Sequence, residues 1–207
     1  MIRNLLRGSC AHWLALLLLL GACAAPPPKP VLQAPALSRA QSLVAAQRNG
    51  FQLSGRVAVK YDEKSFSGGV RWEHNGSGDE IWILAPLGRG VARIVQDAGG
   101  ISLTTAEQKT YRALDAESLT REVLGWSLPL SGLQYWVLGI AAPESAAQAQ
   151  HDAQQRLARL NQDSWEIAYL RYKPEQESGM PARITLSRGD LQISLIIDDW
   201  TIPSLAR

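Results

Sequence analysis

Cys23 carries the most specific chemical signal in the sequence, because of the residues in front of it. An apolar run at residues 13–20 follows a basic start, and the small pair Gly21-Ala22 separates this run from the cysteine. Such an order is typical of a secretory signal peptide, and the run is shorter than the about 20 apolar residues that span a bilayer. A cysteine at this point is typical of the bacterial lipobox. We therefore expect removal of residues 1–22, a diacylglyceryl group on the thiol and an acyl group on the new amine; the alternative is an ordinary signal peptide with a chance cysteine.

The net charge of +2 belongs to this expected signal peptide. Of the 21 lysines and arginines, Arg3 and Arg7 lie before Cys23, whereas all 19 acidic residues lie after it. The processed chain would therefore be neutral and without basic clusters, so it lacks the electrostatic footprint of a nucleic-acid-binding protein. Cys23 would also be its only cysteine, which excludes an intramolecular disulfide.

Groups that could perform catalysis are scarce after Cys23. His74 and His151 are isolated in the sequence, His74 in an expected polar turn, so the usual zinc and thiol-nucleophile patterns are missing. The sequence has neither a Gly-x-Ser-x-Gly elbow nor a phosphate-binding glycine loop. Asp198 and Asp199 are adjacent, but neighbouring strand residues face opposite sides of a sheet. We therefore expect no enzymatic activity, no metal and no cofactor.

Residues 23–35 are expected to form a lipidated, proline-rich tether. They contain five prolines, which favour an extended conformation reaching on the order of 35 Å at about 3.1 Å per residue. The remaining residues, 36–207, are enough for a single well-buried domain.

Most of this domain follows the two-residue period of half-buried strands. Phe51, Leu53, Val57 and Val59 alternate with polar residues, as do Phe66, Val70 and Trp72 in the next segment. A helix at residues 37–48 precedes them. Residues 80–85 are almost continuously apolar, which indicates a strand covered on both faces. Further strands are expected at residues 91–96, 101–105, 109–113, 165–172, 183–187 and 191–198.

Two helices are expected in the middle of the chain. Asp115 can cap a helix that ends at Leu124 and is closed by Gly125. Ser131 can cap a second helix, which would place four apolar residues on one face: Leu133, Trp136, Val137 and Ile140. Residues 141–155, rich in alanine and glutamine, fit a helix or a loop. The whole pattern predicts an α+β fold built around a curved antiparallel sheet.

The processed chain contains six tryptophans, most of them in apolar strands or at helix ends: Trp72, Trp82, Trp126, Trp136, Trp165 and Trp200. Each one alone fits ordinary core packing. Together with a half-barrel sheet and amphipathic helices, they indicate a hydrophobic cavity.

Several short motifs occur in a fixed order behind the expected lipobox. They are Gly55-Arg56-Val57-Ala58-Val59, Trp72, Ala85-Pro86-Leu87-Gly88, Leu124-Gly125-Trp126, Leu128-Pro129-Leu130, the sequence LQYWVLG at residues 133–139, residues 162–165, Met180-Pro181 and Asp199-Trp200. Through them the chain resembles the LolB family over residues 37–200, although Asp163-Ser164-Trp165 departs from the glycine expected there. The resemblance implies an incomplete antiparallel barrel with helices that form a lid over a hydrophobic cavity, and a strand around residues 156–161.

The resemblance also implies a function. The protein would be a receptor anchored in the outer membrane by its lipid and facing the periplasm. It would accept lipoproteins from the soluble periplasmic carrier LolA through their acyl chains and insert them into outer-membrane lipid. Exposing three such chains to water would cost tens of kcal/mol, at about 0.8 kcal/mol per CH₂, so transfer must pass between sheltered cavities. We expect a monomer.

Two sets of site residues follow. The acyl chains are expected to contact apolar faces of the sheet and lid, although ordinary core packing is open for each residue: Phe51, Leu53, Val57, Val59, Val70, Trp72, Leu133, Trp136 and Val137. In the turn Pro86-Leu87-Gly88 the leucine can project outward or fold back; the family carries a protruding apolar residue here, which implies membrane insertion.

Two rival functions remain open. One is a structural lipoprotein that binds a protein partner, which a filled core with an exposed edge strand would favour. The other is a lipocalin-like carrier of a small hydrophobic ligand.

Overall fold

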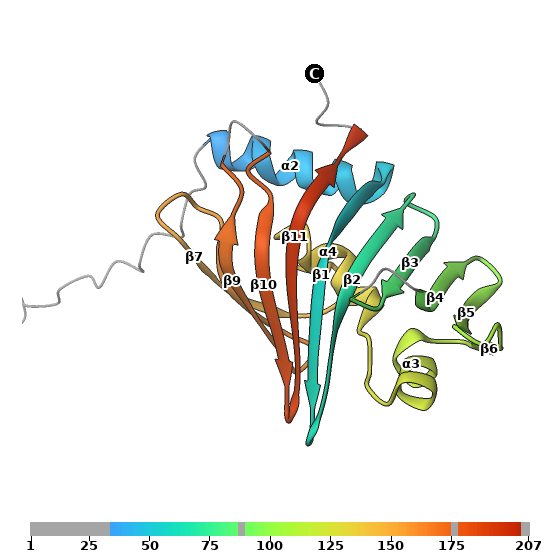
Figure 1. Cartoon of the computed structure of the whole chain (residues 1–207). Coiled ribbons are helices and arrows are strands. Elements are labelled where there is room, and N and C mark those ends of the chain that lie inside the picture. Colours follow the sequence, from blue (N-terminus) through green and yellow to red (C-terminus); the bar gives the residue numbers. More distant parts are fainter. Residues whose placement is uncertain (1–33, 87–89, 175–177, 204–207) are drawn as a thin grey trace, which may run out of the picture. The chain divides into compact units, whose positions relative to one another are not determined.

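A single curved sheet of 11 strands forms the framework of the protein in the computed structural model (Figure 1). The structure describes residues 34–86, 90–174 and 178–203, with side chains from residue 39 onward. Its elements are α2 (Ala34–Asn49), β1 (Phe51–Tyr61), β2 (Lys64–His74), β3 (Asp79–Leu84), β4 (Gly90–Asp97), β5 (Gly100–Thr105), β6 (Thr110–Ala113), α3 (Ala116–Leu124), α4 (Leu130–Trp136), β7 (Ala147–His151), β8 (Leu157–Gln162), β9 (Trp165–Tyr172), β10 (Pro181–Arg188) and β11 (Leu191–Thr201).

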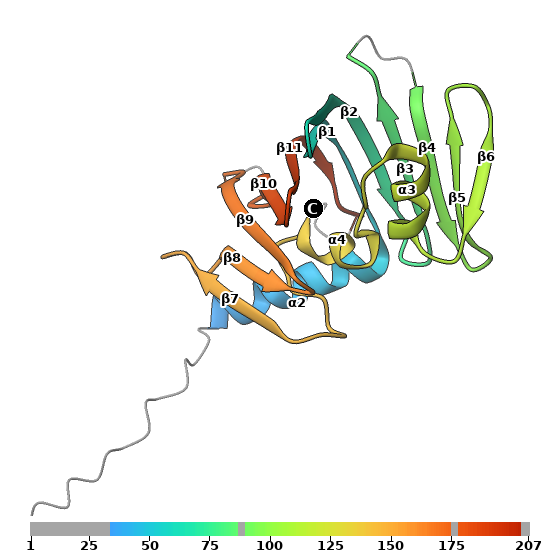
Figure 2. The ribbon, with the colours of Figure 1, turned by 90° about the horizontal axis from the view of Figure 1, so that it is seen from below.

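The sheet is antiparallel and open. Its strand order is β6-β5-β4-β3-β2-β1-β11-β10-β9-β8-β7, so the first and last strands of the chain pair at the centre, whereas β6 and β7 form the two edges. Figure 2 shows the sheet curving around α4, with α2 across one end, and α3 lies against β5 and β6. This architecture confirms the predicted fold class, an incomplete antiparallel barrel with helices. The strand implied around residues 156–161 is present as β8.

The interior of the barrel is built from the predicted alternation. On β1 the apolar residues Phe51, Leu53, Val57 and Val59 are buried, whereas the residues between them are exposed or partly exposed. The other strands and the helices contribute to the same hydrophobic core, which is continuous from α2 to β5. Alternation with a two-residue period therefore decides which face of each strand points inward.

Gly55 marks an irregularity in the centre of the sheet. The pairing of β1 with β11 shifts register between Ser54 and Gly55. A Cβ atom on Gly55 would clash with the backbone carbonyl of Ile196. The close approach of the two backbones therefore requires glycine at this bulge.

The helix α3 has the predicted caps. The Asp115 side chain accepts a 2.8 Å hydrogen bond from the Ser118 N–H, and Gly125 ends the helix with φ 84°. The prediction for α4 was wrong in its start. α4 begins at Leu130, with Pro129 at the N-cap and no side-chain cap, so Ser131 lies inside the helix. The buried segment before α4 fixes this start, because the Leu128 N–H donates to Thr120 Oγ1 on α3 at 2.8 Å.

Residues 141–155 are neither the helix nor the plain loop that their composition allows. Ala147–His151 form the edge strand β7, paired with β8, and all five residues are exposed. The loop before β7 is held by Gln162, whose buried side chain exchanges hydrogen bonds with the backbone of Ala142 and also donates to Ser145. Backbone pairing in the sheet therefore outweighs the helix preference of alanine and glutamine.

Two further differences concern β3 and α2. The outer face of β3 is not covered, because Trp82 remains 37% exposed, with Arg93 stacked over its ring at 5.0 Å. The apolar composition of this strand therefore misled the prediction of two-sided burial. The helix α2 begins at Ala34, inside the predicted tether, and ends at Asn49.

Candidate functional site

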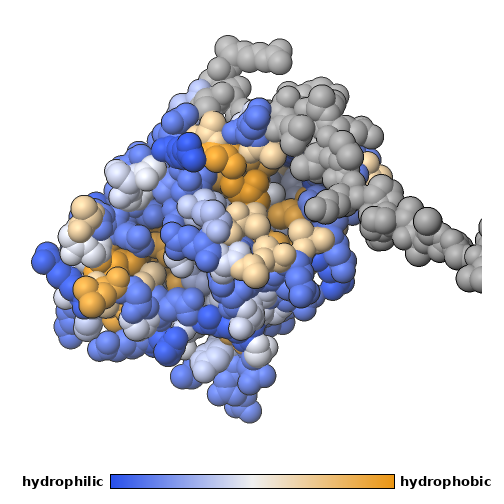
Figure 3. Space-filling view, turned by 180° about the vertical axis from the view of Figure 1, so that it is seen from behind, coloured by the Kyte–Doolittle hydropathy of each residue, from blue (hydrophilic) through white to orange (hydrophobic). Residues whose placement is uncertain are grey.

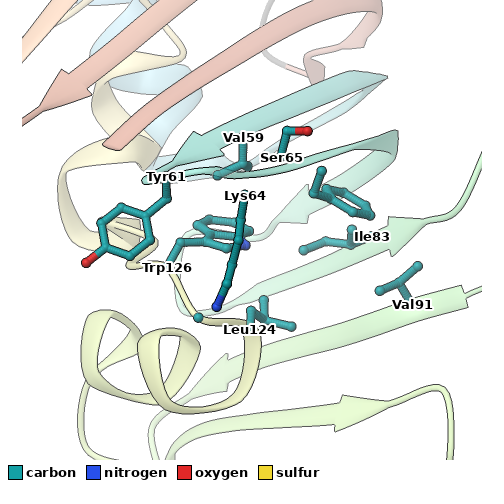
Figure 4. A pocket seen from close by; sticks show the side chains of 10 residues that line it. Val59, Tyr61, Lys64, Ser65, Ile83, Val91, Leu124 and Trp126 are labelled. Carbon is teal, nitrogen blue, oxygen red and sulfur yellow. The ribbon is translucent and has the colours of Figure 1, made fainter. Parts of the chain in front are cut away.

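An apolar pocket of about 360 Å³ opens where the β1–β2 hairpin reaches beyond the neighbouring strands (Figure 4). Its walls come from the hairpin, from the facing ends of β3 and β4, and from the end of α3. The lining residues are Val59, Tyr61, Lys64, Ser65, Phe66, Ile83, Val91, Leu124, Gly125 and Trp126. Apolar surface therefore dominates this pocket.

Strand lengths explain why the space exists. β2 begins at Lys64 and pairs with β1 from this residue onward, but its last pair with β3 joins Gly69 to Leu84, so the first residues of β2 have no strand on the β3 side. The inward-facing Phe66 is therefore only partly buried. On the opposite side the left-handed Gly125 turns the chain after α3 and brings Trp126 into the wall.

The sequence identified one lining residue, Val59, among the candidates for acyl contact. The other eight are buried in the hydrophobic core and do not line this pocket: Phe51, Leu53, Val57, Val70, Trp72, Leu133, Trp136 and Val137. Their contact with acyl chains remains a prediction. The missed residues carried a signal, since Phe66 continues the inward face of β2, and Ile83 and Val91 flank the turn at residues 86–90 on β3 and β4.

Part of the expected insertion loop lies outside the described residues. Pro86 is exposed, but Leu87 and Gly88 fall in the gap between residues 86 and 90. Cys23 lies before residue 34 and is likewise outside the described part of the chain.

Hydrophobic side chains are also exposed at the surface of the protein. On the face seen in Figure 3 they form separate patches that are surrounded by hydrophilic side chains.

The other end of the barrel interior is closed by polar and aromatic groups. His74 is 3% exposed, not in a polar turn as predicted, because its ring packs against Phe51 at a centroid distance of 5.1 Å. Its Nδ1 lies 2.9 Å from Asp79 Oδ1, and its Nε2 lies 2.8 Å from the backbone oxygen of Gln47 on α2. Trp72 donates its indole N–H to the same carboxylate at 2.7 Å.

Both partners of the His74 ring are acceptors, so the geometry favours the doubly protonated imidazolium, which has a donor on each nitrogen. Burial alone would lower the pKa of His74, but the hydrogen bond and charge of Asp79, together with the carbonyls of Gln47 and Gly78, raise it above the ordinary value. The last turn of α2 favours a cation in the same way, since its carbonyl groups carry partial negative charge. These hydrogen bonds join α2 to β2 and β3, and the contact between His74 and Asp79 is a buried ion pair when His74 is protonated.

Residues 34–86, 90–174 and 178–203 contain neither a candidate metal centre nor a helix that could span a membrane. No group of three or more His, Cys, Asp or Glu side chains there could hold a metal ion. No helix in these ranges is long and apolar enough to cross a membrane.

Comparison with known proteins indicates the family of the chain. The family model described as "Outer membrane lipoprotein LolB" matches residues 49–200. The Outer-membrane lipoprotein LolB of Nitrosomonas europaea is 39% identical, over 93% of this chain and 92% of its own length. The protein of the same name from Stutzerimonas stutzeri is 38% identical, over 99% of this chain and 100% of its own.

The fold also has a solved counterpart. A putative outer membrane lipoprotein-sorting protein domain from Vibrio parahaemolyticus superposes with a TM-score of 0.50, over 83% of this chain and 93% of that one. Its sequence is 11% identical, so this likeness concerns the fold alone. The match of the family model and the identity to full-length relatives together show that the chain belongs to the LolB family.

Proposed function

We propose that the protein is an outer-membrane-anchored receptor that accepts lipoproteins from the periplasmic carrier LolA through their acyl chains and inserts them into the outer membrane. The observation that carries the proposal is the pocket beside the β1–β2 hairpin, whose wall includes Val59, Phe66, Ile83, Val91 and Leu124. Alkyl chains gain about 0.8 kcal/mol per CH₂ in such surroundings. The relatives' name, Outer-membrane lipoprotein LolB, agrees with this role. The activity proposed is binding and transfer, without catalysis.

The size of the pocket suggests how a client is held. A volume of about 360 Å³ is near the lower end of the range of about 300–1,000 Å³ that holds one small ligand. One acyl chain fits this range, whereas a client with three chains needs more room. We infer that the wall formed by α3 and Trp126 moves outward when a complete client binds. A gradient of affinities from carrier to receptor to bilayer would give the transfer its direction.

The anchor and the insertion step are further parts of the proposal. Cys23 would be lipidated, which mass spectrometry of the mature N-terminus can test. Leu87 would enter the bilayer next to the pocket, since Ile83 and Val91 on either side of its turn line the pocket. Burial of one leucine yields roughly 1.5–3 kcal/mol, which favours a membrane-touching pose without anchoring the protein.

A transfer assay tests the central step. Protein without its lipid anchor is added to purified LolA loaded with a lipoprotein, and the client bound to each protein is measured after separation. The proposal expects the client to change hands. Retention of the client by LolA, with a folded acceptor present in excess, would contradict it.

Leu87→Glu separates acceptance from delivery. This variant should fold and accept the client from LolA but fail to deliver it to liposomes. Normal delivery by Leu87→Glu would show that the loop is not an insertion device.

One observation favours a second function. All five residues of the edge strand β7 are exposed, and an uncovered edge can pair with a strand of another protein. A structural lipoprotein could use this edge to bind a partner. In that case the transfer assay would fail, and mutation of the pocket would leave function in the envelope unchanged.

A further inference from the structure

Among the described residues that line the pocket, Lys64 is the one charged side chain, and none of them is a carboxylate. Lys64 is the first residue of β2 and pairs with Tyr61 across the hairpin. Figure 4 shows its side chain extending from β2 across the pocket toward Leu124 on α3. A positive charge is therefore held at the rim of an otherwise largely apolar cavity.

The Lys64 ammonium has no ion-pair partner among the described residues, although Asp62 and Glu63 precede it directly. Trp126, which is 9% exposed, also lacks a partner. Its indole N–H makes no hydrogen bond within residues 34–86, 90–174 and 178–203. An ammonium offers three donors and an indole offers one, and neither group can accept. The pocket thus combines an apolar wall with two hydrogen-bond donor groups that have no acceptor among the described residues.

We propose that this pocket binds a single-chain anionic amphiphile, a long-chain carboxylate whose alkyl chain lies against Phe66, Ile83 and Val91 and whose head is held by Lys64. The proposal rests on the acyl-binding function proposed above and adds a preference for a negatively charged head. The Lys64 ammonium meets a full negative charge on a carboxylate but only a dipole on the ester or amide carbonyl of a lipoprotein, so Lys64 holds the carboxylate more tightly. Free fatty acid therefore competes with clients for the same pocket.

The volume and the charge pattern agree with this ligand. About 360 Å³ accommodates one chain better than the three chains of a complete client. No described lining residue is a carboxylate, so an anionic head meets no like charge among them. An aliphatic stem lets the ammonium of Lys64 stay at the aqueous rim while its methylene groups cover the chain.

Binding of palmitate and methyl palmitate tests the proposal, because the two differ in head charge but share the acyl chain. Each is offered as a radiolabelled ligand in equilibrium dialysis, below the concentration at which it aggregates, to the protein with residues 1–23 removed. The wild-type protein should bind palmitate roughly twofold to fivefold more tightly than methyl palmitate, as expected for an exposed ion pair. Lys64→Met keeps the apolar stem and should abolish this preference, whereas Lys64→Arg should retain it.

Lys60→Met is the matched control, since Lys60 lies four residues away in the same hairpin, is exposed, and does not line the pocket. It should leave both affinities unchanged. Equal binding of the two ligands to the wild type, or an unchanged preference in Lys64→Met, would overturn this inference alone; Lys64 would then only complement the carbonyl end of α3. Failure of the wild type to bind either ligand would overturn the proposed acyl-binding function as well.

Discussion

The two ends of the barrel interior differ in how their side chains are satisfied. At the α2 end, His74 and Trp72 are buried and both hydrogen-bond to the buried carboxylate of Asp79, and the ring of Phe51 packs on both of their rings. At the hairpin end, Phe66 is only partly buried beside a cavity of about 360 Å³. The α2 end is fully packed, whereas at the hairpin end apolar side chains face an unfilled cavity.

From this contrast we expect the two ends of the sheet to have different roles. The same two strands, β1 and β2, run through both ends. The packed α2 end can therefore fix one end of these strands while the walls of the pocket at the other end adjust to a ligand. Native interiors are packed as densely as organic crystals, so an incompletely filled apolar end supports the lipid binding proposed above. The closed end should determine stability, and the open end should determine lipid binding.

Alanine at the two phenylalanines gives the largest expected effect on this comparison. Phe51→Ala removes a 1% exposed ring that lies 5.1 Å from Trp72 and 5.7 Å from Trp200 between centroids. It should lower the free energy of unfolding by about 3–5 kcal/mol. Phe66→Ala should cost only about 1 kcal/mol, because its ring already faces a cavity, but it should weaken acyl binding. Urea denaturation and palmitate binding measure the two effects, and equal destabilisation by both variants would remove the proposed distinction.

Removal of the buried negative charge should have the next largest effect. Asp79→Asn leaves the His74 imidazolium without its counter-charge and should lower the free energy of unfolding by about 3 kcal/mol. Glu80→Gln is the neighbouring control, since it breaks an ion pair with Arg93 whose side chains are 45% and 35% exposed. Exposed pairs contribute about 0–1 kcal/mol. Urea denaturation compares the two variants, and a small loss in Asp79→Asn would show that the ion pair does not hold the α2 end together.

The pH dependence of stability gives a smaller effect. Because the pKa of His74 is raised by folding from the ordinary value of 6.5, its stabilisation is complete below about pH 6.5 and is lost as the pH rises through the folded pKa. A neutral ring can donate to only one of its two acceptors, so the loss should be roughly 1–3 kcal/mol.

Urea denaturation between pH 6 and 9 measures this change. His74→Gln should remove it, whereas replacement of His151, which is exposed on β7, should not. A wild-type profile that stays flat above pH 6 would argue against a buried imidazolium.

Local signals in the sequence were sufficient for much of the framework. The alternation on β1 predicted which residues are buried, and the polar and glycine caps of α3 predicted both of its ends. These features are set by neighbours in the chain. The resemblance, in turn, gave the strand β8 where composition alone did not.

Features that depend on partners far apart in the sequence were not predictable in this way. His74 looked like a turn residue, and its burial depends on the carboxylate of Asp79 and a backbone oxygen on α2. Trp82 lies in an apolar strand whose outer face has no covering layer. The pocket was missed in most of its lining because it results from unequal strand lengths, which leave Phe66 paired with β1 but without a partner on the β3 side. Hydrophobicity marks the inner face but does not indicate where that face remains unfilled.

Photocrosslinking to a client's acyl chain tests the central claim most directly. A photoreactive phenylalanine analogue is placed at Phe66 in the pocket, at Phe51 in the closed end, or at Tyr111, which is exposed on the edge strand β6. Each folded variant is mixed with LolA that carries a lipoprotein with radiolabelled acyl chains, and is then irradiated. We expect labelling at Phe66 and none at Phe51 or Tyr111. Labelling at Phe51 with none at Phe66 would contradict it, because the acyl chain would then occupy the end of the barrel that the structure shows to be filled.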